Sequence, residues 1–272
     1  MPLQIEIHSS SNVPLEVEGI LPTVVRDKSL AEIEKLPIFQ GNRKLVLADF
    51  FRVTGDPTDL VMEWQGDLTG VHWLGTKLTA GKIIVPGSVG RHVGSEMRGG
   101  EILVHGNVGD WVGAEMHGGL IHVHGNAGHL VGAAYRGSAK GMTKGTILVR
   151  GNAGNEIGHS MRRGLIAIGG NIGDLAGINM LAGNIFVFGT AGIRHGAGMK
   201  RGTIGFFGSE LPSALPTFRR ACRLQPEFLQ LLFRQLQQFD FPVPAELFAT
   251  PIEMFIGDIV TGGRGELLLR AG

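Results

Sequence analysis

The chain of 272 residues carries 25 Lys and Arg against 24 Asp and Glu, which leaves a formal net charge of +1. This balance gives no overall field that would favour nucleic acid or an anionic membrane as a partner. The single cysteine, Cys222, excludes an intramolecular disulfide and any cysteine-rich zinc or iron–sulfur site, and we expect it to be an inert thiol. We find no signal peptide and no apolar stretch of about 18 residues, so we expect a cytoplasmic protein.

Residues 1–61 form a segment with no regular repeat. Weak alternation predicts short strands at 4–7 and 15–17, and 45–53 is largely apolar and strand-like. Ser29 with Glu32 makes a capping box that predicts a brief helix. We expect this segment to join or close the first end of the domain that follows.

Residues 62–211 are dominated by one repeated pattern, G-x-I-x-V-x-G-N-x-G-x-x-V-G-x-x-M, after a degenerate first copy. The glycines that open the well-formed copies are Gly81, Gly100, Gly119, Gly145, Gly164, Gly183 and Gly202. Their spacings are 19 residues, except for one spacing of 26 between the third and the fourth. A fixed period of this length is typical of solenoid proteins.

Aligned columns of the repeat predict which side chains face inward. The third and fifth positions are apolar in every copy, as in Ile121 and Val123, and this two-residue period indicates a strand with one buried face. A second inward column runs from Val93 to His195, so we interpret His195 as a core histidine, and a third column holds six of the nine methionines. A 19-residue unit is too short for a strand and an ordinary helix. We therefore predict an all-β fold, a right-handed parallel β-helix of about seven coils.

Glycine and asparagine occupy further columns. Four columns of glycine are expected at tight corners, where φ is positive or where backbones of neighbouring coils approach closely. A column that includes Asn107, Asn126, Asn152 and Asn171 predicts a polar ladder between coils, at a bend where asparagine tolerates the left-handed region.

The 26-residue copy contains an insertion between Gly132 and Met142 that should leave the stack as a loop. It holds the only tyrosine of the chain, Tyr135, together with Arg136 and Lys140. The insertion is either a solvated loop or a partner-binding loop, because Tyr and Arg are frequent at interface hot spots. On the second interpretation, Tyr135→Ala would weaken assembly and leave the fold intact.

Residues 212–272 form a C-terminal extension. Segments 218–224 and 226–239 are predicted helices, and the second has an apolar face suited to capping the open end of the β-helix. Segments 253–259 and 266–269 are predicted strands around a TGGRG turn.

Candidate chemistry along the repeat is sparse. Strings such as GNVGDWVG at 106–113 have the glycine spacing of a nucleotide loop, but the same glycines recur in every coil and no P-loop lysine follows. His105, His122 and His124 share one outward face and are weak candidates for a metal site, although stacked histidines also follow from repetition alone. We identify no catalytic residue, and no cofactor-binding residue, on this chain.

The outward columns of the predicted strands are too apolar for bare solvent. We expect Leu103, Leu148, Phe186 and Phe188 to contact another chain or the terminal segments, with Tyr135, Arg136 and Lys140 as the other candidate interface residues.

The recurring G-N-x-G-x-x-V-G-x-x-M-x-x-G, with YRGSAKGM at 135–142, resembles the family of the C subunit of formylmethanofuran dehydrogenase. That family shares its β-helix with the C-terminal domain of the glutamate synthase large subunit. The resemblance covers about residues 60–210, and the Leu-, Ala- and Gln-rich tail is most similar to the C subunit of the bacterial formyltransferase/hydrolase complex of methylotrophs.

This resemblance implies a cytoplasmic scaffold in one-carbon metabolism. In that complex a formyl group passes from formyl-tetrahydromethanopterin to methanofuran or an analogue, and formate is then released. The implied partners are an amidohydrolase-like subunit, a formyltransferase subunit and a dehydrogenase-subunit-B-like chain, with zinc or another metal on a partner and no nucleic acid or membrane. The alternatives are the C subunit of a molybdenum or tungsten formylmethanofuran dehydrogenase, and a free-standing β-helix metal-dependent hydrolase that would use the three histidines.

Overall fold

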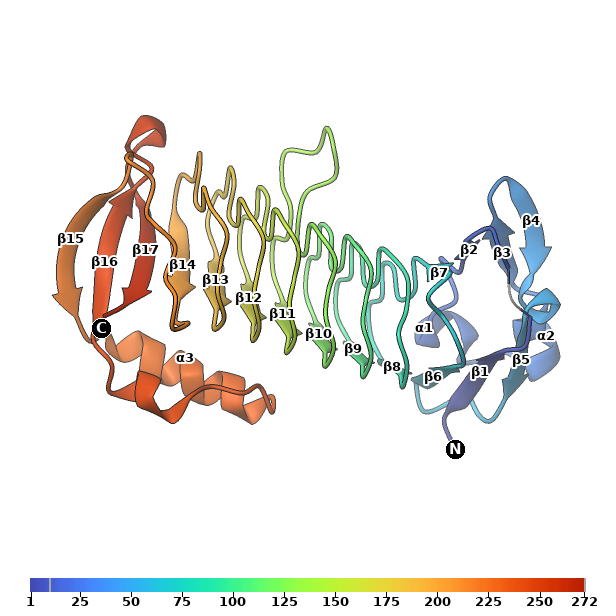
Figure 1. Cartoon of the computed structure of the whole chain (residues 1–272). Coiled ribbons are helices and arrows are strands. Elements are labelled where there is room, and N and C mark those ends of the chain that lie inside the picture. The colour runs from blue at the N-terminus through green and yellow to red at the C-terminus, as the bar shows by residue number, and fades with distance from the viewer. Residues whose placement is uncertain (10, 272) are drawn as a thin grey trace.

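The computed structural model describes residues 1–9 and 11–271 and is mainly β. Figure 1 shows an elongated molecule in which one long sheet runs from end to end. This sheet contains 13 strands in the order β15-β16-β17-β14-β13-β12-β11-β10-β9-β8-β6-β1-β5. The strands that carry the repeat are β8 (Lys82–Val85), β9 (Glu101–Val104), β10 (Leu120–Val123), β11 (Thr146–Val149), β12 (Leu165–Ile168), β13 (Asn184–Val187) and β14 (Gly202–Phe206).

Strands β8 to β14 pair in parallel with the register that the repeat predicts. Lys82 pairs with Glu101 one copy later, and Leu120 pairs with Thr146 across the 26-residue copy. Parallel bridges such as Val89 to Val108 form a second line of pairing on the returning part of each copy. The sheet is therefore long and mostly parallel, as the periodicity predicts.

The predicted inward columns are confirmed. Ile121 and Val123 are fully buried, and so are the six column methionines. His195 is 3% exposed, which confirms a core histidine; its Nδ1 accepts a hydrogen bond from the Ala176 amide at 3.2 Å.

Two physical reasons account for the glycine columns. Gly94 has φ +64°, and a Cβ there would lie 2.5 Å from Cδ1 of Ile121. Gly106 has no left-handed backbone, but its Cβ would lie 2.5 Å from the carbonyl carbon of Gly87 in the preceding copy. The column that opens the copies combines both reasons, because Gly100 has φ +80° and a Cβ there would lie 2.6 Å from the carbonyl oxygen of Gly81.

The asparagine column forms the predicted polar ladder. The amide of Asn126 donates to Oδ1 of Asn107 at 2.8 Å, and the amide of Asn152 donates to Oδ1 of Asn126 at 2.8 Å. The left-handed backbone that we associated with this column lies elsewhere, at two columns of other non-glycine residues. One column holds Trp73, His92, Trp111, Leu130, Glu156, Leu175 and Arg194, and the other includes Lys77, Glu96, Glu115, Ser160 and Asn179.

The N-terminal segment extends the sheet. Strands β1 (Leu3–Ile7), β5 (Phe51–Thr54) and β6 (Val61–Gln65) continue it past β8, and β6 pairs in parallel with β8. A small sheet has the order β4-β3-β2-β7, and the other elements are short helices. The bounds are β2 Leu15–Glu16, β3 Pro37–Gln40, β4 Arg43–Val46, β7 Val71–His72, α1 Pro22–Val25, α2 Leu30–Glu34 and η1 Leu47–Asp49.

The capping box of α2 is confirmed, since the Ser29 amide donates to Oε2 of Glu32 at 2.8 Å. The continuous strand predicted for 45–53 is wrong, because the short helix η1 separates β4 from β5. Its Asp49 side chain accepts from the Val46 amide at 3.0 Å, which favours the turn over an extended chain.

The C-terminal extension differs from the prediction in one segment. Residues 219–224 form strand β15 (Arg219–Leu224) and no helix, because they pair antiparallel with β16 (Ile252–Gly257). β16 pairs in turn with β17 (Gly265–Arg270), and β17 pairs in parallel with β14. The predicted second helix is confirmed as α3 (Glu227–Gln238); η2 (Ala245–Phe248) and η3 (Ile259–Thr261) complete the extension.

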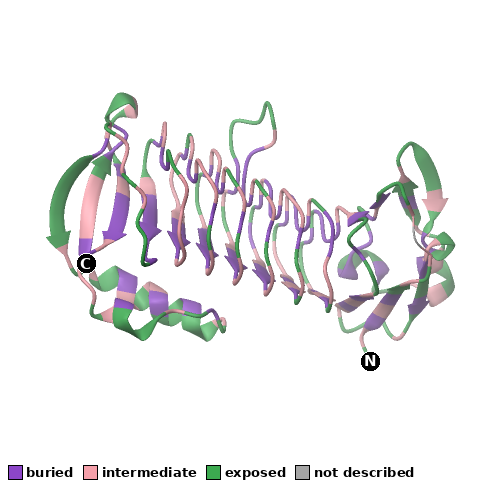
Figure 2. Cartoon of the chain, viewed as in Figure 1, coloured by how far each residue is buried: buried purple, intermediate pink, exposed green. Residues whose placement is uncertain are grey.

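Helix α3 does not cap the end of the sheet, where the chain continues as β17, β16 and β15 (Figure 1). It lies instead along the outward face, and Figure 2 shows that the helix carries both buried and exposed residues. Phe233 and Leu236 of α3 form a second hydrophobic core with Leu148 and Phe186 of the sheet. The apolar outward column predicted from the sequence is thus covered in part by the chain's own helix. Within the described chain, no helix is long and apolar enough to cross a membrane.

Candidate functional site

The insertion of the 26-residue copy forms a loop that projects from the edge of the sheet where β11 begins (Figure 1). Its base is fixed to the next copy by two backbone hydrogen bonds. The amide of Ala134 donates to the carbonyl of His159 at 3.0 Å, and the amide of Gly141 donates to that of Ser160 at 2.9 Å. The tip of the loop, which includes Arg136 and Lys140, is exposed.

Tyr135 anchors this loop on a cluster of aromatic side chains. The rings of Trp73 and His92 stack with centroids 4.0 Å apart and an interplanar angle of 3°. Tyr135 stacks on Trp111 with centroids 4.9 Å apart and contacts His92 with centroids 5.7 Å apart. Trp73, His92 and Trp111 occupy one column of successive copies, so the repeat itself builds the surface on which Tyr135 lies.

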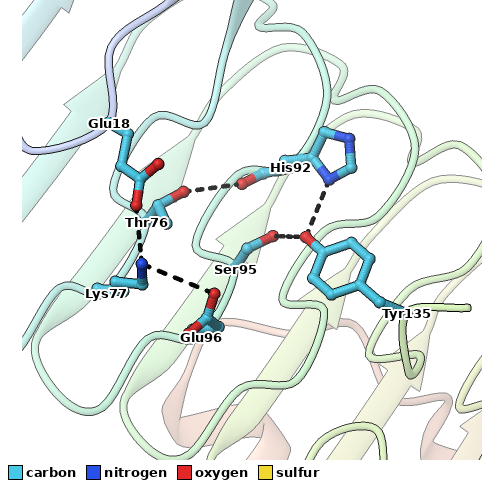
Figure 3. A network of polar contacts seen from close by, with 7 residues as sticks. All are labelled: Glu18, Thr76, Lys77, His92, Ser95, Glu96 and Tyr135. Carbon is cyan, nitrogen blue, oxygen red and sulfur yellow. Dashed lines mark hydrogen bonds and ion pairs between the residues drawn. The ribbon is translucent and has the colours of Figure 1, made fainter. Parts of the chain in front are cut away.

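Polar contacts of Tyr135 continue onto the preceding copies (Figure 3). Its hydroxyl donates to Oγ of Ser95 at 2.8 Å, and Nδ1 of His92 lies 3.0 Å from the same oxygen. Since the hydroxyl proton points to Ser95, the Nδ1–H of His92 is the donor in the second bond. Burial lowers the pKa of His92 to about 4 and raises the pKa of Tyr135 to about 12, so both groups are neutral at pH 7.

An ion-pair network lies beside this cluster. Nζ of Lys77 lies 2.8 Å from Oε1 of Glu18 and 4.0 Å from Oε1 of Glu96, and the hydrogen bond and charge of Glu18 raise the pKa of Lys77 (Figure 3). These contacts link the N-terminal segment to the first copies of the repeat. Because the lysine and the Glu18 side chain are about half exposed, we attribute little stability to the pair.

The three histidines proposed as a weak metal site lie together but are engaged otherwise. Nδ1 of His105 and Nδ1 of His124 are 3.1 Å apart, whereas Nε2 of His122 accepts from Nε of Arg150 at 3.2 Å. Arg150 also pairs with Asp240. Among residues 1–9 and 11–271, no group of three or more His, Cys, Asp or Glu side chains is arranged to hold a metal ion.

Comparison with known proteins identifies the family, although no protein-family model matches the chain. One chain of the crystal structure of the formyltransferase/hydrolase complex (FhcABCD) from Methylorubrum extorquens, in complex with methylofuran, superposes with a TM-score of 0.89. It is 30% identical in sequence, and the match covers 99% of this chain and 100% of that one. The chain is a C subunit of the formylmethanofuran dehydrogenase family.

Archaeal members of this family match over a shorter segment. The C subunit of tungsten-containing formylmethanofuran dehydrogenase 2 from Methanothermobacter marburgensis is 42% identical over 86 residues, 30% of this chain and 32% of the relative. The C subunit of molybdenum-containing formylmethanofuran dehydrogenase 1 from Methanothermobacter thermautotrophicus is 43% identical over 87 residues, 32% of this chain and 22% of the relative. The chain therefore matches a third or less of the length of these curated relatives.

The candidate interface residues of this family member fall into different environments. Leu148 and Phe186 are fully buried beneath α3, so of the two contacts expected for them, another chain or the terminal segments, the structure shows the second. Phe188 is half-buried and packs against Phe207, Phe233 and Phe241, again within the chain. Leu103 is half-buried on the outward face, and Arg136 and Lys140 are exposed.

The aromatic cluster beneath Tyr135 was not among the sites predicted from the sequence. The signal was present, because Trp73, His92 and Trp111 recur at the 19-residue spacing of the repeat. Their column is hard to recognise, because in later copies it holds aliphatic and charged residues in place of aromatic ones. The left-handed backbone of these positions could not be anticipated from residue type, since non-glycine residues rarely adopt it.

Proposed function

We propose that this chain is a non-catalytic scaffold subunit of a formyltransferase/hydrolase complex. The complex would transfer a formyl group from formyl-tetrahydromethanopterin to methanofuran or an analogue and release formate in one-carbon metabolism. The observation that carries this proposal is the similarity to one chain of the Methylorubrum extorquens complex, at 30% identity over 99% of this chain and 100% of that one. Matching length and fold favour an equivalent position in an equivalent assembly.

The scaffold role is supported by the environments of the candidate catalytic and metal-binding side chains. The histidine group is held in hydrogen bonds, and His92 and Tyr135 of the aromatic cluster are neutral, half-buried groups. We infer that the metal expected for formyl hydrolysis is held by an amidohydrolase-like partner, and that a formyltransferase subunit and a dehydrogenase-subunit-B-like chain complete the assembly.

We further interpret the architecture as a right-handed parallel β-helix of about seven 19-residue coils. Two observations support this interpretation. Each strand pairs with the equivalent strand of the next copy, and a second line of parallel bridges joins the copies. The chain then consists of an N-terminal segment (1–61), the β-helix (62–211) and a C-terminal extension (212–272). Strand pairing continues across both boundaries, so we expect the three parts to unfold together.

A second candidate function is the C subunit of a molybdenum or tungsten formylmethanofuran dehydrogenase. The relatives with 42% and 43% identity favour it, although their matches cover 32% and 22% of the relatives' length. In that case a partner would carry the redox metal and this chain would keep a structural role.

The test is purification of the assembly from its native source, with mass spectrometry of the subunits and elemental analysis. We expect an amidohydrolase-like and a formyltransferase-like subunit with zinc, and no molybdenum or tungsten. Molybdenum or tungsten with iron–sulfur subunits would move the function to the dehydrogenase. A metal-loaded chain that purifies alone and hydrolyses substrate would overturn the scaffold proposal.

A further inference from the structure

The strands of the parallel sheet all begin at one edge, and exposed cations gather there. They lie one or two positions before the glycines that open the copies. We call this row the basic edge, and it comprises Arg98, Lys144, Arg162, Arg163, Lys200, Arg201 and Arg264. Arg264 belongs to it because Gly265 of β17 pairs with Gly202 of β14, which places Arg264 beside Arg201.

The basic edge is not neutralised by the chain itself. Within the described part of the chain, none of its seven cations takes part in an ion pair. Two carboxylates near the starts of these strands are engaged elsewhere: Glu101 pairs with Lys82 at 2.9 Å, and Glu266 accepts from Thr203 at 2.8 Å. The net charge of +1 conceals this local excess of positive charge.

A row of like charges along a sheet is unfavourable for an isolated chain. Neighbouring strands lie about 4.8 Å apart, a spacing at which facing side chains of the same sign repel one another. Lys144 and Arg163 each precede the opening glycine of one of two neighbouring copies, whose strands β11 and β12 are paired, and Arg163 follows Arg162 directly. Carboxylates of a bound partner would relieve this repulsion and steer the partner to this edge.

The insertion loop stands on the same edge. Figure 1 shows it rising where β11 begins, and Figure 2 shows that its tip is exposed. The tip adds Arg136 and Lys140, and the chain returns from it to Lys144. Because Tyr135 and two backbone hydrogen bonds fix the base of the loop, these cations extend the basic edge at its centre.

We propose that the basic edge, with the insertion loop at its centre, docks an acidic surface of a protein partner in the assembly. This proposal rests on the proposed function, since it names the face by which the scaffold holds a neighbour. The same edge of a second copy is excluded as occupant, because two rows of cations would repel. A nucleic acid is the competing polyanion, and the experiment distinguishes it.

The experiment uses the purified complex. The variant K144Q/R162Q/R163Q removes three adjacent cations and keeps long polar side chains. The matched control R43Q/K44Q/R52Q removes three exposed cations of β4 and β5 at the far end of the molecule. We expect the edge variant to weaken partner affinity by about 10- to 100-fold at about 0.15 M salt, the range for lost interfacial charge pairs, and the control to change it less than about threefold.

Zero-length carbodiimide cross-linking of the wild-type complex identifies the occupant. We expect Lys140, Lys144 and Lys200 to join Asp or Glu residues of one partner, and Lys44 to join none. Equal partner affinity of both variants at every salt concentration would overturn the docking proposal and leave the proposed function standing. Loss of heparin retention by the edge variant with unchanged partner affinity would overturn it in favour of a polyanion. If no partner is recovered with the wild-type chain, the proposed function itself fails.

Discussion

Of the segments that depart from the repeat, the C-terminal extension and the insertion loop attach to it by different kinds of contact. The C-terminal extension covers an apolar face: Phe233 and Leu236 of α3 pack on Leu148 and Phe186 of the sheet, and all four are at most 1% exposed. The insertion loop is attached by one aromatic ring, three hydrogen bonds that involve side chains and a few backbone bonds. The C-terminal extension buries its part of the sheet and makes it inaccessible to partners. The insertion loop is anchored at its base only, so its exposed tip is held in place and accessible to a partner.

This difference in attachment predicts a difference in energy. Burial of several large apolar side chains stabilises a contact far more than one neutral hydrogen bond does. Both segments are attached to the repeat at 62–211, which we call the frame. The stability of the protein should be most sensitive to substitutions in the frame, because its buried columns are continuous from copy to copy. Substitutions in the frame, in the extension and in the loop therefore form a graded series.

The largest effect is expected in the frame. Ile121→Asp places a carboxylate in a fully buried column between two other copies, and should lower the free energy of unfolding by about 4 kcal/mol or more. Urea denaturation followed by circular dichroism measures it. The control Val260→Asp, at a side chain that is 78% exposed, should change stability by less than about 0.5 kcal/mol. A normal unfolding curve for Ile121→Asp would contradict the inward register.

The extension should respond next. Phe233→Ala leaves a cavity between α3 and the sheet, and should cost about 3–5 kcal/mol. Hydrogen exchange should show that the amides of α3 lose protection before those of β11 to β14. Leu231→Ala on the exposed side of the same helix, at 68% exposure, should cost less than about 0.5 kcal/mol. Equal protection of α3 in both variants would show that the helix is held by something other than this core.

The repeat could be recognised in the sequence because the same buried environment recurs six or seven times in each inward column. Ile121 and its equivalents needed no tertiary information beyond the period. The position of α3 could not be predicted, because the apolar face of a helix shows that the helix packs on another surface but does not identify that surface. Residues 219–224 were misassigned for a related reason: their conformation depends on pairing with β16, which lies about 30 residues later in the chain. Cys222 lies in this strand as an exposed free thiol.

The contacts of His122, where the C-terminal extension meets the sheet, predict that the folded state loses stability at acid pH. His122, 7% exposed, accepts from Arg150, which pairs with Asp240 just after α3. Burial, then the charges of His124 and Arg150, lower the pKa of His122 to about 4, while Asp240 acts in the opposite direction and His105 adds a minor lowering. His122 is therefore protonated near pH 6.5 in the unfolded chain, but only near pH 4 in the folded chain.

Stability should thus fall as the pH drops from about 6.5 to 4, by up to about 1.4 kcal/mol per pH unit for this one group. His92, whose pKa is also lowered to about 4 by burial, contributes in the same direction. We expect His122→Asn to lose about 1–2 kcal/mol less than the wild type between about pH 6.5 and 5 in urea titrations. The matched control is His117→Asn at an exposed histidine. Parallel pH profiles for His122→Asn and the wild type would refute this role of His122.

The loop should show the smallest effect on stability. Tyr135→Phe keeps the ring on Trp111 but removes the hydroxyl that donates to Ser95 and accepts from His92, and should cost about 1 kcal/mol. Tyr135→Ala also removes the ring, so exchange protection of the loop base at Ala134 and Gly141 should fall further. If the loop presents its exposed cations to a partner, the Ala variant should weaken assembly more than the Phe variant while both keep the wild-type fold. Equal assembly of the two variants with the wild type would mean that the ordered loop base serves only the chain itself.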